Sequence, residues 1–243
     1  MAGPVEVEKL LSGFPGRADR GFFGWSNVYL LKGERLALFD TGFYTDRAEL
    51  LIELEKRSIA PGDIDMVILS HLHYDHCINL ALIPGAEVLL SPRELEYARG
   101  ECREKGDIYI VDYPDSLLAG RTLRLAEEGT LVMDGVVLME TPGHTPGCIS
   151  AVAETPDGPV VLAGDAIKNG WEVMNNTPTM AFVGIDMARK SMKRILDTGG
   201  IIIPGHDRAF VYRNGGLEYL EELGVVLEVR EDPSGPPKKY RIP

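Results

Sequence analysis

The sequence of 243 residues predicts an α/β fold, with one domain over residues 1–230. Short apolar runs that are rich in β-branched residues and bounded by Gly or Pro have the pattern of buried strands. Two longer stretches, 46–57 and 185–197, carry apolar residues at helical spacing. A chain of this length buries a complete hydrophobic core without disulfides or structural staples.

The first half of the chain predicts five strands and three helices. In order, these are an edge strand at 4–11, a hairpin of strands 28–32 and 36–39, a helix at 46–57, a strand at 66–69, a helix from about Asp75, a strand at 87–91 and a helix at 92–100. The hairpin turns at Gly33, the first long helix carries leucines at helical spacing from Leu50, and Pro92 suits the first position of a helix. Residues 101–130 show no clear pattern.

The second half predicts a further run of strands with one long helix. In order, these are strands at 131–133, 136–140, 149–154 and 159–163, a helix at 185–197, a strand at 201–203, a short helix near 217–223 and a strand at 225–229. The long helix places Ile185, Met192 and Ile195 on one face. Residues 166–183 are expected to be irregular, and 231–243, rich in Pro, to form a mobile tail.

Composition is that of an ordinary globular protein, with 44% apolar and 26% charged residues. No apolar run approaches the roughly 18 residues of a membrane span. The first residues lack a basic and an apolar segment, so we expect no signal peptide and a cytoplasmic location.

The three cysteines, Cys77, Cys102 and Cys148, have no spacing typical of a disulfide framework and are expected to be free thiols. The net charge of −12 disfavours binding to nucleic-acid phosphates.

Histidines and aspartates that follow the predicted strands form the most specific motif. They are His71, His73, Asp75 and His76 in one run of six residues, His144 in Pro-Gly-His-Thr-Pro-Gly, Asp165 in Gly-Asp and His206 in Pro-Gly-His. All five histidines of the chain belong to this set. The odds of finding His-x-His-x-Asp-His by chance at this composition are on the order of one in ten thousand. Imidazole nitrogen and carboxylate oxygen are ligands that zinc favours, so the sequence predicts a metal centre where loops converge at the strand ends.

These motifs resemble those of the metallo-β-lactamase superfamily. The resemblance covers about residues 25–210 and begins with Asp40-Thr41-Gly42. It implies a four-layer αββα sandwich with two metal ions, expected to be zinc, with iron or manganese as alternatives. It also implies how the ligands divide: His71, His73 and His144 on one ion, Asp75, His76 and His206 on the other, and Asp165 bridging them. Asp40 would support the ligands without binding metal.

Two adjacent metal ions predict hydrolytic chemistry. Such a pair lowers the pKa of a shared water to about 7, which gives a hydroxide nucleophile at neutral pH. Asp75 or Asp165 would relay a proton to the leaving group. A purely structural zinc site is normally closed and four-coordinate, whereas seven nitrogen and oxygen ligands without cysteine exceed what one such ion needs. The sequence therefore favours catalysis.

Departures from known subfamilies narrow the substrate. Zinc β-lactamases usually carry Cys or a non-bridging residue where Asp165 stands, and flavodiiron oxidoreductases carry an acidic residue where His73 stands. Only about 37 residues follow His206, too few for the extra domain of glyoxalase II-like thioesterases. Acyl-homoserine-lactone lactonases resemble the ligand set closely, but Lys168 occupies the region of their usual tyrosine. Residues 170–206 also resemble, more loosely, a compact branch that includes an RNA-cleaving nuclease.

Three activities stay open from these comparisons: hydrolysis of a small ester, lactone or thioester; a phosphodiesterase or RNase with the same dinuclear site; and a mononuclear iron persulfide dioxygenase. A binding protein that has lost catalysis is disfavoured by the intact ligand set. The acidic charge favours the first, with a small-molecule substrate and no membrane partner; a nucleic-acid partner is disfavoured but stays open. Aromatic and apolar residues near the ligand loops are candidate pocket walls: Phe22, Phe23, Trp25, Tyr74, Trp171, Met174 and Phe182. Lys168 is either an oxyanion donor or a solvated lysine. Exposed Phe and Trp loops suggest a homodimer.

Overall fold

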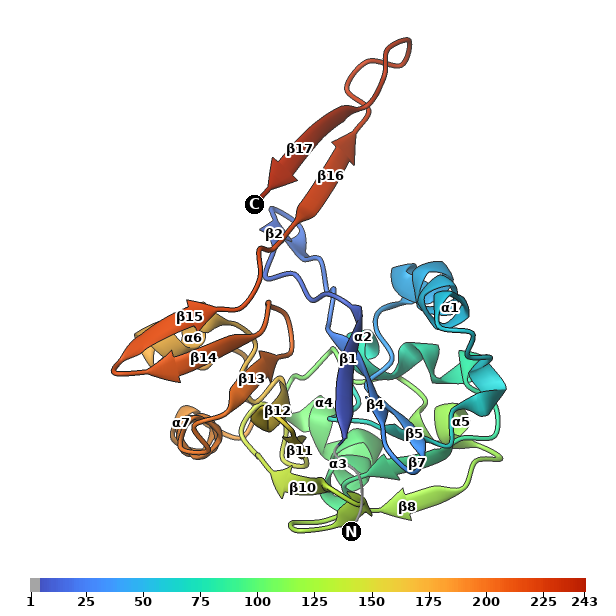
Figure 1. Cartoon of the computed structure of the whole chain (residues 1–243), viewed down its shortest axis with the longest axis vertical. Helices are drawn as coiled ribbons and strands as arrows, with labels where there is room; N and C mark the ends of the chain where they lie inside the picture. Colours follow the sequence, from blue (N-terminus) through green and yellow to red (C-terminus); the bar gives the residue numbers. More distant parts are fainter. Residues whose placement is uncertain (1–4) are drawn as a thin grey trace.

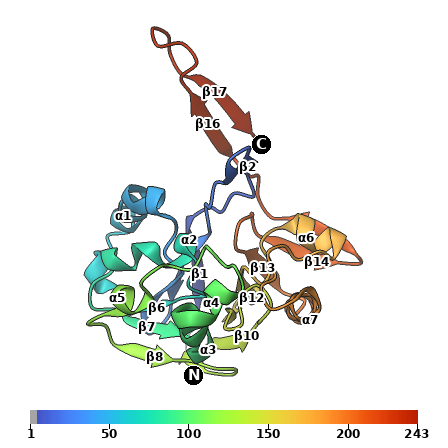
Figure 2. The same ribbon diagram turned by 180° about the vertical axis from the view of Figure 1, so that it is seen from behind.

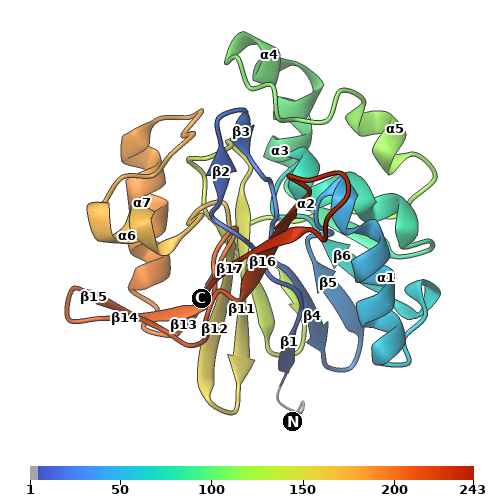
Figure 3. The same cartoon turned by 90° about the horizontal axis from the view of Figure 1, so that it is seen from above.

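Two β-sheets pack face to face at the centre of the structure, and helices cover the outer face of each (Figure 3). The computed structural model describes residues 5–243. One sheet has six strands in the order β1-β4-β5-β6-β7-β8, and the other has seven in the order β15-β14-β13-β12-β11-β10-β9. The predicted four-layer αββα sandwich is therefore confirmed.

The strands fall into the two sheets and two small ribbons. The six-stranded sheet contains β1 (Glu6–Leu11), β4 (Val28–Lys32), β5 (Leu36–Phe39), β6 (Met66–Ile68), β7 (Glu87–Leu90) and β8 (Leu123–Leu125). The seven-stranded sheet contains β9 (Leu131–Met133), β10 (Val136–Glu140), β11 (Ile149–Thr155), β12 (Gly158–Gly164), β13 (Ile201–Pro204), β14 (Phe210–Arg213) and β15 (Gly216–Tyr219). The ribbons are β2 (Arg17–Ala18) with β3 (Gly21–Phe22), and β16 (Val225–Val229) with β17 (Lys238–Ile242).

The helices are short, except for one on each outer face. They are α1 (Arg47–Lys56), α2 (Tyr74–Cys77), α3 (Pro92–Glu96), α4 (Cys102–Glu104), α5 (Pro114–Leu118), α6 (Gly170–Asn175) and α7 (Ile185–Leu196), with single turns of 3-10 helix at Tyr44–Asp46, Pro61–Asp63 and Ile78–Leu82. A π-helical turn, Tyr97–Glu101, joins α3 to α4. None of the described helices is long and apolar enough to cross a membrane.

Three apolar layers hold the sandwich together. Side chains such as Leu31, Met66 and Leu162 fill the space between the sheets. Alternate residues of the six-stranded sheet, such as Leu30 and Val67, pack against α1, α3 and α5, while β12, β13 and β14 pack against α6 and α7. Because central strands such as β6 and β12 are covered on both faces, they are continuous apolar runs rather than alternating ones.

Parallel pairing brings the carboxyl ends of key strands together. β5 pairs in parallel with β6, and β12 pairs in parallel with β13. Asp40 follows β5, His71 follows β6, Asp165 follows β12 and His206 follows β13. The loops that carry these polar residues therefore converge at one edge of the sandwich, as expected for an α/β site.

One predicted element is wrong. A helix was expected near 217–223, but β14 and β15 form an antiparallel hairpin across this region, with Arg213 opposite Gly216. Asn214 and Gly215 both have positive φ, of 52° and 78°. An Asn-Gly pair of this conformation makes a tight hairpin turn, which outweighs the helical spacing of the leucines.

Two further segments have more structure than the sequence predicts. The irregular segment 166–183 contains α6. Within the expected tail, residues 238–242 form β17, which pairs with β16 from Val225↔Ile242 to Val229↔Lys238. This hairpin stands away from the rest of the molecule in Figure 1 and, seen from behind, in Figure 2. The mobility of 231–243 stays a prediction.

Candidate metal centre and active-site cavity

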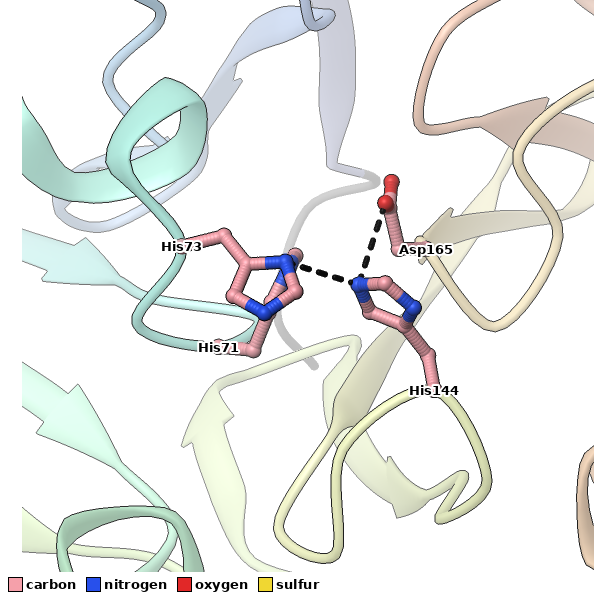
Figure 4. Close-up of side chains that lie close together, drawn as sticks. All are labelled: His71, His73, His144 and Asp165. Carbon is pink, nitrogen blue, oxygen red and sulfur yellow. Dashed lines mark hydrogen bonds and ion pairs between the residues drawn. The ribbon is translucent and has the colours of Figure 1, made fainter. Parts of the chain in front are cut away.

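Seven side chains from both halves of the chain converge at the carboxyl edge of the sheets. They form two groups, His71, His73, His144 and Asp165, and Asp75, His76 and His206, and within each group the donor atoms lie within 4.8 Å of one another. The loop after β6 and helix α2 supply four of them, and the loops after β10, β12 and β13 supply the others. Figure 4 shows the first group, with His73 and Asp165 directed at His144.

Asp165 lies between the two groups. Its Oδ2 is 3.3 Å from Nε2 of His144, and its Oδ1 is 3.3 Å from Nε2 of both His76 and His206. Asp75 is on the far side of the second group, with Oδ2 3.3 Å from Nε2 of His206. One carboxylate oxygen of Asp165 thus faces each group, which is the arrangement that a bridging ligand requires.

The backbone at Gly205 lies close to the carboxylate of Asp165, and this contact is possible because glycine has no side chain. A Cβ at this position would lie 2.1 Å from Asp165 Oδ1, so any side chain would displace the carboxylate. Glycine is therefore required at position 205, directly before His206, because only glycine leaves room for the Asp165 carboxylate.

Each imidazole has an acceptor or hydroxyl for the nitrogen that faces away from the centre. The pairs are His71 Nδ1 with Ser70 Oγ (2.9 Å), His73 Nε2 with Asp107 (2.9 Å), His76 Nδ1 with Asp40 (2.7 Å), His144 Nδ1 with the Met180 carbonyl (2.8 Å) and His206 Nδ1 with the Trp25 carbonyl (2.9 Å). Such partners fix the ring orientation and leave the inner nitrogen free to bind a metal.

Two buried polar atoms of the site, His71 Nε2 and Asp165 Oδ1, have no hydrogen-bond partner. Buried polar atoms without partners are costly, and a metal ion at each group would satisfy both.

Asp40 contacts the candidate ligand His76 and the neighbouring Ser70 without joining either group. Its carboxylate accepts hydrogen bonds from the Ser70 amide (2.7 Å) and hydroxyl (2.8 Å), besides its contact with His76. Asp40 has a φ of 59°, a region that asparagine and aspartate enter more readily than other residues.

Asp107 is a functional residue that the sequence did not reveal. It lies in the segment without a clear pattern, and besides His73 it accepts hydrogen bonds from the Tyr97 hydroxyl (2.9 Å) and the Tyr109 amide (3.0 Å). Tyr97 begins the π-helical turn, an irregularity that often occurs at functional sites. The ionised carboxylate is stabilised by these donors, which together with His73 hold the pKa of Asp107 below its usual range although burial opposes this.

Replacing Asp107 with asparagine should lower the affinity for metal about 10- to 100-fold, because His73 loses the carboxylate that orients it. A competition titration against a chelating dye measures the change. Asp112→Asn alters an exposed aspartate in the same segment and should leave the affinity unchanged. Equal affinities for the wild type and Asp107→Asn would remove Asp107 from the site.

Glu94, on α3, is a second residue that the sequence did not reveal. It is fully buried, and it accepts hydrogen bonds from the Leu72 amide (3.0 Å) and the Gly147 amide (3.2 Å). Leu72 lies between His71 and His73, and Gly147 lies in the loop of His144. A Cβ on Gly147 would lie 2.1 Å from the Glu94 amide nitrogen, so glycine is needed there. Burial raises the pKa of Glu94.

The two ligand groups differ in electrostatics. Burial lowers the pKa of His71 and His144 well below the usual range, so these two imidazoles are neutral. In the second group, burial again opposes the charged imidazole, but Asp165 and other nearby carboxylates raise the pKa of His76 well above its usual value. Burial also opposes ionisation of Asp165, yet the surrounding histidines hold its pKa well below the usual range. Ionised carboxylates among imidazoles attract divalent cations.

A cavity of about 420 Å³ opens over both ligand groups. Of the predicted wall residues, Phe22, Phe23, Tyr74 and Lys168 line it, together with Arg20, Ile108, Tyr109 and Met180, which were not predicted. Trp25 stacks on Phe23 (ring centroids 5.6 Å apart), and Phe182 packs beside His73 (5.9 Å) and His144 (6.0 Å). Trp171 and Met174 lie outside the lining and are exposed. The walls are mainly apolar, which suits a small organic substrate.

Lys168 is buried, with 8% of its surface exposed, so it is not a solvated lysine. Its Nζ donates to the Thr179 carbonyl (2.6 Å) and lies 3.9 Å from Asp165 and 3.8 Å from Glu172. His144 Nδ1 is 3.1 Å away, but it already donates to Met180 and cannot also accept. An ammonium has three donors, so further protons of Lys168 can reach a substrate oxygen in the cavity.

Comparisons with known proteins agree with this geometry. A family profile described as "Metallo-beta-lactamase superfamily" matches residues 22–206. The human protein "Metallo-beta-lactamase domain-containing protein 1" is 32% identical over 71% of this chain, and the match spans only 58% of the human protein. An "N-acyl homoserine lactonase" of Bacillus sp is 29% identical over 84% of this chain and 77% of its own length. A solved structure of a quorum-quenching N-acyl homoserine lactone lactonase has the same fold, with a TM-score of 0.67 and 24% identity over 85% of this chain and 94% of that one.

Proposed function

The chain belongs to the metallo-beta-lactamase superfamily, and from this premise we propose that it is a metal-dependent hydrolase of small esters, lactones or thioesters. The position of Asp165 carries the proposal, because its two oxygens face two separate ligand groups. Such a site suits two metal ions, and zinc is the ion that this set of imidazole and carboxylate ligands favours, with iron or manganese as alternatives.

The ligands of one ion would be His71, His73 and His144, those of the other Asp75, His76 and His206, and Asp165 would belong to both. Two metal ions held there would supply a hydroxide nucleophile at neutral pH and polarise the substrate's carbonyl. The chain's own residues hold the candidate ligands in position before a substrate binds. Each histidine has an outer hydrogen-bond partner that keeps its ring in place. Asp75 is partly exposed and lines the cavity, so it can pass a proton to the leaving group.

The cavity and the charge support a neutral, partly apolar substrate. Phe22, Phe23, Ile108 and Tyr109 form its walls. The net charge of −12 repels nucleic-acid backbones at long range, which disfavours a phosphodiesterase or RNase. The Bacillus relative that is named as an N-acyl homoserine lactonase makes lactones the first substrates to try. A mononuclear iron dioxygenase would leave the group of Asp75, His76 and His206 without a role.

Metal content and substrate class test the proposal together. Protein purified without added metal or chelator should contain about two zinc ions per chain by elemental analysis. The same preparation is then assayed on a panel of lactones and thioesters and on single-stranded RNA. Hydrolysis of the panel but not of RNA supports the proposal. One iron per chain with oxygen consumption and no hydrolysis overturns it, and cleavage of RNA alone reassigns the substrate.

Replacing Lys168 with methionine should lower kcat about a hundredfold with little change in KM, since a donor aimed at a developing oxyanion acts mainly in the transition state. Steady-state kinetics on the best substrate of the panel measure both constants. Lys190→Met removes an exposed lysine from α7 and serves as the matched control. If Lys168→Met raised KM and left kcat intact, Lys168 would instead anchor an anionic group of the substrate.

A further inference from the structure

Glu172, on α6, is a buried carboxylate that belongs to neither ligand group, and only 1% of its surface is exposed. Its Oε2 accepts a hydrogen bond from the Lys168 amide (2.9 Å), and its Oε1 accepts from the Thr179 amide (2.7 Å) and from the Thr179 hydroxyl. A carboxylate has acceptor sites for all three donors, whereas glutamine, which has the same shape, has one acceptor oxygen. Glu172 therefore ties together the two segments that carry Lys168 and Thr179.

Both ends of the Lys168 side chain depend on these contacts. The backbone of Lys168 is held on two sides, because its amide donates to Glu172 and its carbonyl accepts from the His206 amide (2.8 Å). The ammonium donates to the Thr179 carbonyl (2.6 Å), and Thr179 is itself held by Glu172. A lysine side chain is long and flexible, so an ammonium fixed only through the backbone would not keep one position. Glu172 holds the start of this side chain directly and its end through Thr179.

Charge gives Glu172 a second effect on Lys168. The ammonium lies 3.8 Å from Oε1 of Glu172 and 3.9 Å from Oδ2 of Asp165. A buried charge is costly unless an opposite charge lies close to it. Asp165 is the proposed bridging ligand, so metal ions would engage its negative charge. Of these two carboxylates, Glu172 would then be the one that compensates the ammonium.

We propose that Glu172 is a positioning residue for the hydrolysis: it holds the Lys168 ammonium at the cavity, where that group meets the substrate. Lys168 and Thr179 line the cavity, whereas Glu172 lies behind them and outside its lining. A small displacement of a group that acts in the transition state lowers a rate by up to about a hundredfold. This inference rests on the proposed function, because it assigns Lys168 a part in the reaction.

A double-mutant cycle separates positioning from a general structural role. The four proteins are the wild type, Glu172→Gln, Lys168→Met and the double variant, and kcat and KM are measured on the best substrate of the panel. Glu172→Gln should lower kcat/KM about 10- to 100-fold, through the same constant that Lys168→Met changes. In the Lys168→Met background it should lower kcat/KM less than about threefold, because no ammonium is left to position. Glu218→Gln alters an exposed glutamate on β15, serves as the matched control and should keep the wild-type constants.

The metal content of each variant is measured as well. The residue after Thr179 is Met180, whose carbonyl is the hydrogen-bond partner of His144 Nδ1 (2.8 Å). A loosened segment would therefore also weaken the metal site. The assays contain added zinc, and elemental analysis checks that the four proteins hold equal amounts, so that a loss of ions is not mistaken for a displaced ammonium.

Acetylation of Lys168 gives a second measurement that needs no activity. The ammonium is buried and hydrogen-bonded, so N-hydroxysuccinimide acetate should modify it slowly in the wild type, as followed by peptide mass spectrometry. Glu172→Gln should raise this rate about tenfold or more, because the ammonium leaves its site more often. Thr179→Val removes only the hydroxyl donor to Glu172 and should raise the rate less, whereas Thr179→Ser keeps the donor and should not change it. The Thr179 pair decides the question if Glu172→Gln does not fold.

Three results would overturn the proposal. One is an equal loss of kcat/KM from Glu172→Gln in both backgrounds, which indicates a structural role independent of Lys168. Another is a Glu172→Gln protein with the wild-type kcat/KM or the wild-type acetylation rate. The third is a Lys168→Met protein with wild-type kinetics, since Glu172 would then have no reacting group to position. A wild type that hydrolyses nothing on the panel counts instead against the proposed function, and the acetylation rates still decide whether Glu172 holds Lys168.

Discussion

Replacing Asp165 with alanine is expected to lower kcat/KM roughly a thousandfold or more, which corresponds to a loss of about 4 kcal/mol of transition-state stabilisation. Asp165 is the residue whose oxygens face both ligand groups, so its removal affects both proposed ions at once. It also removes the negative charge around which His76, His144 and His206 are arranged. We therefore expect the metal content to fall below one ion per chain.

Activity and elemental analysis of the same preparation check this result. Asp186→Ala is the matched control, because Asp186 is a highly exposed aspartate on α7 that belongs to neither ligand group. Incubation of the wild type with a chelator should reproduce the loss, and added zinc should restore activity in the wild type but not in Asp165→Ala. Full activity in Asp165→Ala, or activity that survives complete removal of metal, would falsify the dinuclear mechanism.

Replacing Glu94 with alanine is expected to destabilise the metal-free protein by about 3 to 5 kcal/mol. The change leaves the buried amides of Leu72 and Gly147 without their acceptor, and each unsatisfied donor costs about 1 to 3 kcal/mol. It also leaves a cavity where a fully buried side chain stood. Because Glu94 ties the His71–His73 loop to the His144 loop, metal affinity should fall as well.

Urea unfolding of the metal-free protein measures the effect on stability. Glu96→Ala lies two residues away on the same helix, where the side chain is 69% exposed, and should change the free energy of unfolding by less than about 1 kcal/mol. Glu94→Gln keeps the shape but retains only one acceptor oxygen, so its effect should fall between the two. A Glu94→Ala protein as stable as the wild type would mean that the two loops are held without this carboxylate.

The fold and the convergence of the candidate ligands could be predicted because both leave local signals. A strand buried on both faces is an uninterrupted apolar run, so Met66–Ile68 and Ile201–Pro204 stand out in the sequence. Parallel neighbours end at the same edge, so polar residues directly after such runs converge. Histidine is rare here, and its confinement to these loops made the convergence visible.

Asp107 and Glu94 could not be predicted, because nothing local distinguishes a supporting carboxylate from a surface one. Both lie in segments dense with charged residues, and only the fold brings Asp107 to His73 and Glu94 to Leu72. Lys168 presents the same difficulty, since burial depends on the turn that follows β12. The error at 217–223 differs in kind: Asn214-Gly215 is a strong hairpin signal that helical spacing of leucines obscured.

The candidate ligands are divided between the two halves of the sandwich: His71 to His76 come from the six-stranded side, and His144, Asp165 and His206 come from the seven-stranded side. During folding, neither half can assemble the site alone, and long-range loop closure must precede tight metal binding. The ions would then bind the finished fold and oppose the separation of its halves. A thousandfold excess of free metal over its dissociation constant adds about 4 kcal/mol to the stability of the bound state. A catalytic metal centre would thus also stabilise the packing of the two sheets against each other.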